Sequence, residues 1–394
     1  MTIIQIKQCL DYGTGVMEKV VNTFMAIIRS AIMETNEDID VSHINYEALL
    51  SLSKFHDLAH VIYYELNKRI ENWEGDTHNR FKQQYDNSIY RFVKRDLAIE
   101  QVKEAFEMAH IDYILLKGSY LLKLYPQPWM RTSSDVDVLV RKEDIDRAIV
   151  TLNKKGFVQF LETSKDISFY TPEHYHIELH HSLMEEGIFD NANQLLNTIW
   201  DCVEPNVSKY EKYMSGEMIY FYHVVHMAKH FKNGGCGVRF FIDLWLLNHT
   251  ISFDNDKRVA LIKSSGLDSF EKKVRLLSEK WFSRNEDFSD IQEIEKYIFE
   301  GGTYGNLDHS AAIRKNNARN MLLYYMRRVF QPYCIMKNSY PKLRKYPILL
   351  PFFWVARWFN ILDPKVRRNA KNEIKIIRGN TNEQIELLFN ELEI

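Results

Sequence analysis

Two aspartates alternate with apolar residues in the segment SDVDVLV, residues 134–140. Side chains two residues apart on a strand point to the same face, so Asp135 and Asp137 present paired carboxylates while Val136 and Val138 face a core. Neighbouring carboxylates repel each other unless a cation lies between them. Oxygen ligands of this kind suit Mg²⁺ or Mn²⁺. The alternative interpretation is an edge strand with two solvated acids.

A turn upstream, Lys117-Gly118-Ser119, follows the apolar run 113–116 and precedes a helix-like stretch. Glycine lets the backbone approach a ligand closely, and the free N–H groups at a helix start attract phosphate. The turn precedes Asp135 by sixteen residues, which is enough for a short helix and a loop returning to the neighbouring strand. We therefore expect the turn and the aspartates to meet at one site, although turns of this composition are common.

A third group of polar residues lies in HYHIELHH, residues 174–181. Strand alternation places His176, Glu178 and His180 on one face. Glu178 is a candidate third carboxylate that binds metal or deprotonates an acceptor hydroxyl. The His-Glu-His face is also compatible with zinc, and the competing interpretation is a half-exposed polar strand face.

Around these motifs, periodicity predicts a small α+β core between two helical regions. Apolar spacing of three and four predicts helices up to about residue 105, including a long one over 79–109. Strands are expected at 113–116, 136–140, 157–161, 167–170 and 175–181, with a helix over 143–155 that stops at Gly156. Helix signals return from about residue 190, most clearly at 218–231 and 238–247. The expected regions are 1–105 (helical), 106–189 (core) and 190–394 (helical).

The amino-acid composition indicates the broad class to which the protein belongs. The chain has 394 residues, 45% hydrophobic and 26% charged, with a formal net charge of −2. This balance is that of an ordinary soluble protein and argues against a surface built wholly for nucleic acid. The four cysteines are far apart, no signal peptide is recognisable, and the longest apolar stretch, 347–362, is too short to span a bilayer. We therefore expect a cytoplasmic protein.

The wider stretch LLKGSYLLKLYPQPWMRTSSDVDVLV, followed by YHIELHHSL, resembles the nucleotidyltransferase superfamily, whose fold is shared with DNA polymerase beta. It looks most like the uncharacterised bacterial nucleotidyltransferases with a KG…Y…R…SDxDxLV pattern. The close resemblance covers roughly residues 111–183, and weaker similarity extends into the helices on both sides.

This resemblance implies an enzyme that transfers a nucleoside monophosphate from a nucleoside triphosphate with the help of Mg²⁺ or Mn²⁺. It implies that Gly118 and Ser119 form the triphosphate-binding turn and that Asp135 and Asp137 are metal ligands. Glu178 is then the third acid, although many members of the superfamily carry an aspartate there. Lys117 and Arg131 are placed to neutralise phosphate charge, or instead pair with acids of the core.

Two weaker features leave alternatives open. His223, His226 and His230 lie on one predicted helix and either line the cleft, bind a metal or are packing residues. The segment 327–378 is strongly basic and interrupted by aromatic residues, which suits an anionic partner such as RNA, a lipid surface or a phosphorylated glycan precursor, or else a solvated helix face.

Three functions follow from these observations. The first is transfer of the nucleotide to an acceptor hydroxyl of a small molecule. The second is a toxin-like nucleotidyltransferase that modifies tRNA or protein, and the third is a non-catalytic nucleotide-binding protein. The intact aspartate pair argues against the third.

Overall fold

The computed structural model of the chain describes residues 15–163, 165–184, 189–205, 208–283, 291–303, 342–359 and 382–394, and residues 326, 329–333, 336 and 340. At 15–17, 344, 359 and 382–386 only the backbone is described. More than half of the basic segment 327–378 therefore lies outside the described residues, including Arg327, Arg328, Lys337 and all of 360–378.

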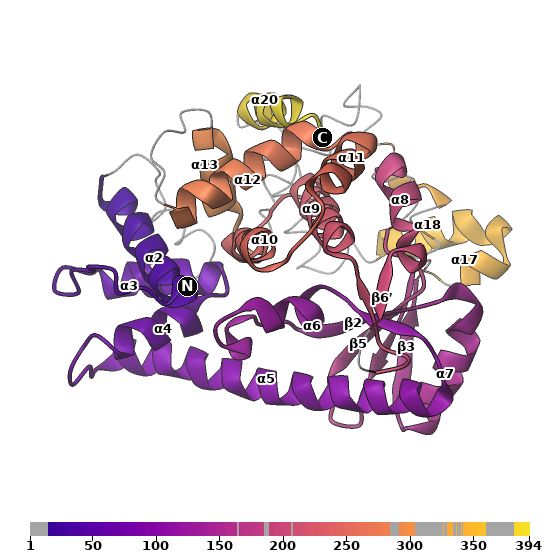
Figure 1. Ribbon diagram of the computed structural model, residues 1–394. Helices are drawn as coiled ribbons and strands as arrows, with labels where there is room; N and C mark the ends of the chain where they lie inside the picture. The colour runs from indigo at the N-terminus through magenta and orange to yellow at the C-terminus, as the bar shows by residue number, and fades with distance from the viewer. Residues whose placement is uncertain are drawn as a thin grey trace.

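A mixed five-stranded sheet with the order β1-β2-β5-β4-β3 lies to one side of the molecule, at the right in Figure 1. Strand β2 is antiparallel to β1 and parallel to β5, while β4 is antiparallel to both β5 and β3. All five predicted strands are present, and the expected α+β class with flanking helical regions is confirmed. The strands are β1 (Tyr113–Leu115), β2 (Asp135–Val140), β3 (Val158–Glu162), β4 (Asp166–Tyr170) and β5 (His176–His180).

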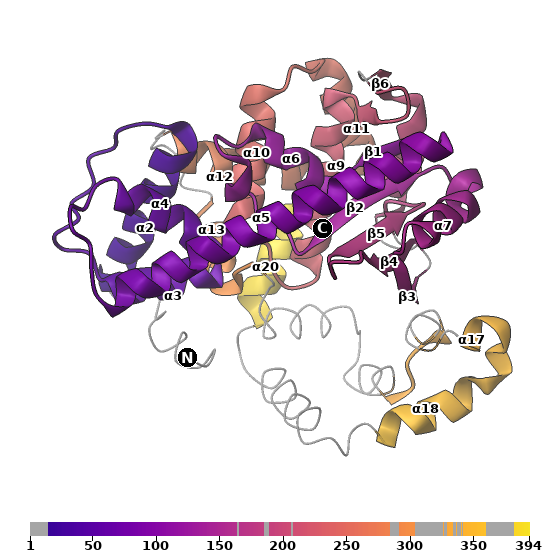
Figure 2. The ribbon, with the colours of Figure 1, turned by 90° about the horizontal axis from the view of Figure 1, so that it is seen from below.

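One face of the sheet is buried by two helices, α5 (Asp76–Ala109) and α7 (Ile145–Lys154). Figure 2 shows α5 crossing the whole underside of the molecule, from the N-terminal helices to the sheet. The apolar cluster on this face combines residues of the C-terminal part of α5, such as Phe106, with Val136 and Ile177 of the strands. The expected regional boundary at residue 105 thus falls inside a continuous helix.

The opposite face of the sheet lies toward the second, larger apolar cluster, which joins the N-terminal and C-terminal helices. Ile114 and Leu139 contribute to it from β1 and β2. Odd-numbered residues of β2 and even-numbered residues of β5 share this face, so strand alternation directs Asp135, Asp137 and Glu178 toward it.

Most of the remaining helices belong to the N-terminal and C-terminal helical regions. The predicted helices at 218–231 and 238–247 are confirmed with slightly wider bounds, and Ser215 caps the first of them by accepting a hydrogen bond from Met218 N. The bounds are α2 (Gly15–Met33), α3 (Tyr46–Phe55), α4 (Ala59–Asn67), α6 (Lys117–Leu121), α8 (Asp190–Leu196), α9 (Gly216–Lys232), α10 (Val238–Thr250), α11 (Asn255–Ser265), α12 (Asp268–Ser283), α13 (Gln292–Gly301), α17 (Lys342–Lys345), α18 (Leu350–Phe359) and α20 (Asn382–Leu392).

A second, two-stranded sheet was not predicted. It consists of β6 (Val203–Pro205) and β7 (Lys212–Met214), which are antiparallel. Strands of three residues are too short to show a two-residue alternation, so their sequence carries no recognisable signal. No helix of the described part of the chain is long and apolar enough to cross a membrane.

Candidate active site

Three carboxylates converge on one face of the sheet where β2 and β5 lie side by side. The parallel register pairs Asp135 with His176 and Asp137 with Glu178. Asp137 is only 2% exposed, whereas Asp135 and Glu178 are partly buried. The expectation that β2 and β5 bring these acids together therefore agrees with the register of the sheet.

Asp137 is held by two nitrogen donors. Lys117 Nζ lies 2.5 Å and His180 Nε2 lies 2.8 Å from the same oxygen, Oδ1 of Asp137. Burial alone raises the pKa of a carboxyl, but the charge of Lys117 and the hydrogen bond from His180 outweigh it and hold the pKa of Asp137 well below its usual range. Asp137 is therefore ionised and already neutralised by its own neighbours.

Asp135 has a different environment. Burial and the negative charge of Asp137 raise its pKa, although the Ser133 hydroxyl donates a hydrogen bond to Oδ1 at 2.8 Å. The backbone carbonyl of Ser133 in turn accepts a hydrogen bond from the Tyr175 hydroxyl at 3.1 Å. A carboxylate whose ionised form is disfavoured in this way gains from a nearby cation.

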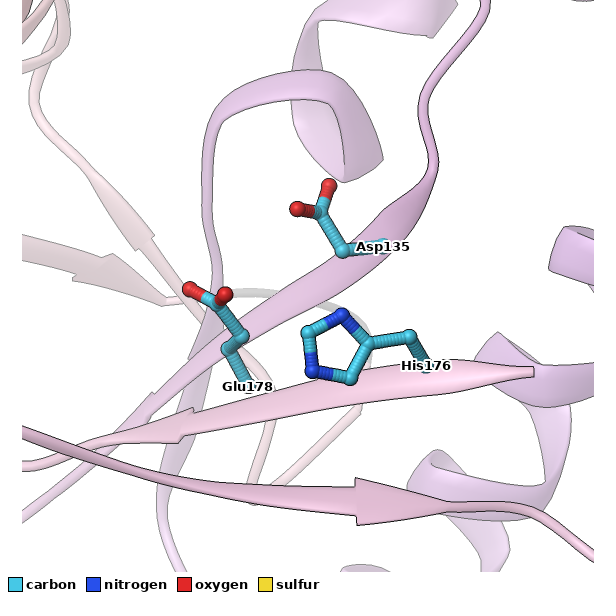
Figure 3. A group of neighbouring side chains, drawn as sticks. All are labelled: Asp135, His176 and Glu178. Carbon is cyan, nitrogen blue, oxygen red and sulfur yellow. The ribbon is translucent and has the colours of Figure 1, made fainter. Parts of the chain in front are cut away.

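Two groups of side chains on these strands are arranged closely enough to hold a metal ion. One combines Asp135, His176 and Glu178, and the other combines Asp137, Glu178 and His180. Within each group the potential ligand atoms lie within 4.8 Å of one another. Figure 3 shows the first group, whose side chains approach one another from β2 and β5.

The glycine-containing turn lies directly against this site. A Cβ atom at Gly118 would come within 3.2 Å of the Cβ and Oγ atoms of Ser133, the residue that donates to Asp135. Lys117 has a positive φ of 45°, a conformation that non-glycine residues rarely adopt and that is enriched at functional sites. The Ser119 hydroxyl is buried and has no hydrogen-bond partner among the described residues. The turn and the aspartates thus meet, as the spacing predicted.

Arg131 pairs with an acid that lies far away in the sequence. Its Nε atom is 2.9 Å and 3.0 Å from the two carboxylate oxygens of Asp243 on α10. Tyr125 donates a hydrogen bond to the same carboxylate at 2.7 Å. Arg131 and Asp243 are 7% and 1% exposed, so the pairing of this arginine with a core acid, one of the two expected roles, is present.

Histidines of α9 lie behind the turn. A cavity of about 30 Å³ is lined by Lys117, Tyr222, His223 and His226, among others, and has room for a water molecule or two. The Nε2 atoms of His226 and His230 are 3.1 Å apart, and burial lowers the pKa of His230 to about 4. No group of three potential metal ligands in the described chain includes these histidines.

Sequence reasoning identified Lys117, Asp137 and Glu178 but missed two neighbours. Ser133 precedes the motif and orients Asp135, and the run of two serines before Asp135 was its only signal. Tyr222 lies close enough to Lys117, Asp137 and Glu178 to interact with their charges, and burial raises its pKa. Nothing in the sequence links this residue of α9 to the strands.

Comparison with known proteins agrees with this arrangement. A sequence profile whose family is described as uncharacterised nucleotidyltransferase matches residues 42–283, well over half of the chain. No curated protein matches. The solution structure of the antibiotic-resistance factor ANT(2'')-Ia shows 9% identity over 49% of this chain and 94% of that chain, with a TM-score of 0.27. A likeness of that size carries no argument about the site.

Proposed function

The chain belongs to the family of uncharacterised nucleotidyltransferases, and from that premise we propose that it transfers a nucleoside monophosphate from a nucleoside triphosphate to an acceptor hydroxyl and releases pyrophosphate. The observation that carries the proposal is the convergence of Asp135, Asp137 and Glu178 on one face of the sheet, beside the Lys117-Gly118 turn. Such a site provides negative charge for a cation and positive charge for phosphate at one place.

The carboxylates fit a divalent cation, Mg²⁺ or Mn²⁺. Asp135 and Glu178 belong to a group of ligand atoms within 4.8 Å of one another, and because burial and the charge of Asp137 raise the pKa of Asp135, a bound cation would stabilise its ionised form. When bound there, the cation supplies positive charge that neutralises the triphosphate and the charge that develops at the α-phosphate.

The chain's own residues provide positioning and proton transfer. We assign to Gly118 and Ser119 the binding of the phosphates, because the Ser119 hydroxyl has no hydrogen-bond partner among the described residues and Gly118 brings the turn against Ser133, beside Asp135. Lys117 and Arg131 are assigned to the neutralisation of phosphate charge. Arg131 acts from a fixed position, because Asp243 holds its guanidinium.

Glu178, one of the residues that would hold the cation through one oxygen, is also assigned the role of general base through its other carboxylate oxygen. It is partly exposed, and His180 Nε2 lies 3.4 Å from its Oε2 atom and helps to orient it. In the proposed step the acceptor oxygen bonds to the α-phosphorus while the bond to the pyrophosphate oxygen breaks. The proton of the acceptor hydroxyl passes to the Glu178 carboxylate.

A small molecule is the proposed acceptor. The formal net charge of −2 supports this choice, because a protein that acts on nucleic acid usually presents a large positive field. Transfer to tRNA or protein is the competing outcome, and the basic segment 327–378 is the feature that would serve it.

The proposal is tested by label transfer. The purified protein is incubated with each α-³²P-labelled nucleoside triphosphate, Mg²⁺ or Mn²⁺, and a cell lysate separated into small molecules, RNA and protein. We expect label in the small-molecule fraction with the unaltered chain. Label in RNA or protein instead would identify the competing acceptor, and absence of label from every fraction, with either metal, would contradict the proposal.

The choice of variants follows from the site. Asp135→Asn is the inactive variant, since Asp135 is not needed to neutralise a buried partner. Removing Asp137 would leave Lys117 and His180 without their acceptor and confuse loss of chemistry with loss of folding. Asp146→Asn is the matched control, because it is the same substitution at an exposed position of α7.

A further inference from the structure

His176 completes a mixed nitrogen and oxygen ligand set that the aspartate motif alone does not predict. It lies beside Asp135 in the parallel register of β2 and β5, and its ring, Asp135 and Glu178 approach one another (Figure 3). Their potential ligand atoms lie within 4.8 Å of one another. Three ligands spread evenly around one ion at a bond of about 2.2 Å lie roughly 3.8 Å apart, so the side chains would have to close by up to about 1 Å on binding it.

The ring nitrogen Nε2 of His176 supports a ligand role. It is buried and has no hydrogen-bond partner within the described part of the chain. Buried polar atoms are nearly always paired, and each exception requires an explanation such as an ion. The ring lies beside both carboxylates (Figure 3), so a cation bound among the three side chains would have an imidazole nitrogen within reach.

Aromatic neighbours fix the orientation of this ring. Its centroid lies 5.4 Å from that of Phe160 and 5.8 Å from that of Tyr170. These two rings are themselves stacked at 4.3 Å. The imidazole thus has an apolar support on one side and carboxylates on the other.

The second group of potential ligands is already engaged. Oδ1 of Asp137 accepts hydrogen bonds from Lys117 Nζ and His180 Nε2, so the charge of this carboxylate is already balanced by its neighbours. The group of Asp135, His176 and Glu178 has no such internal cation. Its two carboxylates carry the formal charge that a dication balances.

We infer that His176, with Asp135 and Glu178, coordinates the divalent cation of this enzyme, and that the site consequently prefers a transition-metal dication such as Mn²⁺ to Mg²⁺. The inference deepens the proposed function and rests on it. Imidazole is a good ligand for first-row transition metals, whereas Mg²⁺ prefers oxygen ligands and retains its waters. The substitution His176→Asn would remove the nitrogen ligand and with it the preference for Mn²⁺.

Mn²⁺ itself is the probe, and electron paramagnetic resonance of the full chain without nucleotide is the measurement. Binding is followed by the loss of the free Mn²⁺ signal, and electron spin echo modulation reports whether an imidazole nitrogen is bonded to the ion. The variant is His176→Asn, and the matched control is His174→Asn, the same substitution at an exposed position with a positive φ of 58° that asparagine tolerates.

We expect nitrogen modulation in the unaltered chain and in His174→Asn but not in His176→Asn. In the last variant the dissociation constant for Mn²⁺ should rise by about tenfold, while that for Mg²⁺, measured by competition, changes much less. His176→Gln replaces His176→Asn if the latter does not fold.

Three results would overturn the inference: modulation that persists in His176→Asn, Mn²⁺ binding without nitrogen modulation in the unaltered chain, or no Mn²⁺ binding. None of them decides the proposed function, because label transfer with Mg²⁺ tests that separately. Conversely, the chain could bind Mn²⁺ with nitrogen modulation and yet transfer no label. That result would refute the proposed transferase activity but support the metal site.

Discussion

The buried pair of Arg131 and Asp243 allows the two roles expected of Arg131 to be separated by experiment. The guanidinium donates from Nε to both carboxylate oxygens and from Nη1 to the carbonyl of Thr132 at 2.7 Å. The pair joins the loop before β2 to α10. The informative perturbation is Arg131→Met, which keeps much of the volume and removes the charge.

The expected magnitude follows from burial. Asp243 is 1% exposed, and removal of one partner from a buried ion pair leaves an uncompensated charge that costs about 3–5 kcal/mol of the free energy of unfolding. Replacing both partners with apolar residues, Arg131→Met with Asp243→Leu, removes that charge. The Tyr125 hydroxyl then loses its acceptor, at a cost of about 1–3 kcal/mol, so the double variant should be more stable than Arg131→Met.

Urea denaturation, monitored by tryptophan fluorescence, measures these free energies, and nucleotide binding is measured in parallel. If Arg131 and Asp243 stabilise the fold as an ion pair, we expect a large loss of stability in Arg131→Met. The double variant should then recover part of that loss. The reasoning would be refuted if Arg131→Met lay within about 1 kcal/mol of the unaltered chain and the double variant were no better. Arg131 would then serve the ligand alone.

Four further predictions concern the site and the core. Asp135→Asn should lower label transfer by about 100-fold or more without lowering the melting temperature, because it relieves repulsion from Asp137. Asp137→Asn should destabilise the chain by about 1–3 kcal/mol in urea denaturation, since the Lys117 ammonium and the buried His180 ring lose a charged acceptor. An unchanged free energy of unfolding would contradict this statement, and a lowered melting temperature of Asp135→Asn would contradict the first. Gly118→Ala should reduce kcat by about tenfold at unchanged stability, because the added Cβ presses on Ser133, and an unchanged kcat would show that the contact is unimportant. Burial lowers the pKa of His56 to about 3, so between pH 6.5 and 3 only its unfolded form binds a proton. His56 should therefore contribute a fall of about 1.4 kcal/mol per pH unit in the free energy of unfolding on acidification, and His56→Leu should lower the measured slope by that amount.

Much of the fold was predictable because its signals are local. The alternation of Asp135 to Val138 and of His176 to His180 predicted two strands with their polar residues on one face, and the structure has both. Gly156 marked the end of the helix over 143–155, and its φ of 87° agrees with that position.

The remaining parts depend on contacts between distant residues. Nothing in the sequence indicates that Lys117 lies within hydrogen-bonding distance of Asp137, because that contact depends on the register of β1 against β2. The partner of Arg131 lies on a helix 112 residues further along the chain. The orphan nitrogen of His176 is likewise visible only when the burial of the strand is known.

Helix α5 has a consequence for how the molecule can be divided. Its 34 residues extend for about 51 Å, and the two apolar clusters both include residues of this helix, Phe81 in one and Phe106 in the other. Arg95, 2% exposed in the middle of the helix, donates hydrogen bonds to the carbonyls of Arg131 and Pro128. A shortened chain that begins at residue 106 would therefore lose the cover of one face of its sheet and the support of the loop before β2. Limited proteolysis should accordingly release no independently folded catalytic fragment, and the N-terminal helices and the sheet should unfold in one transition.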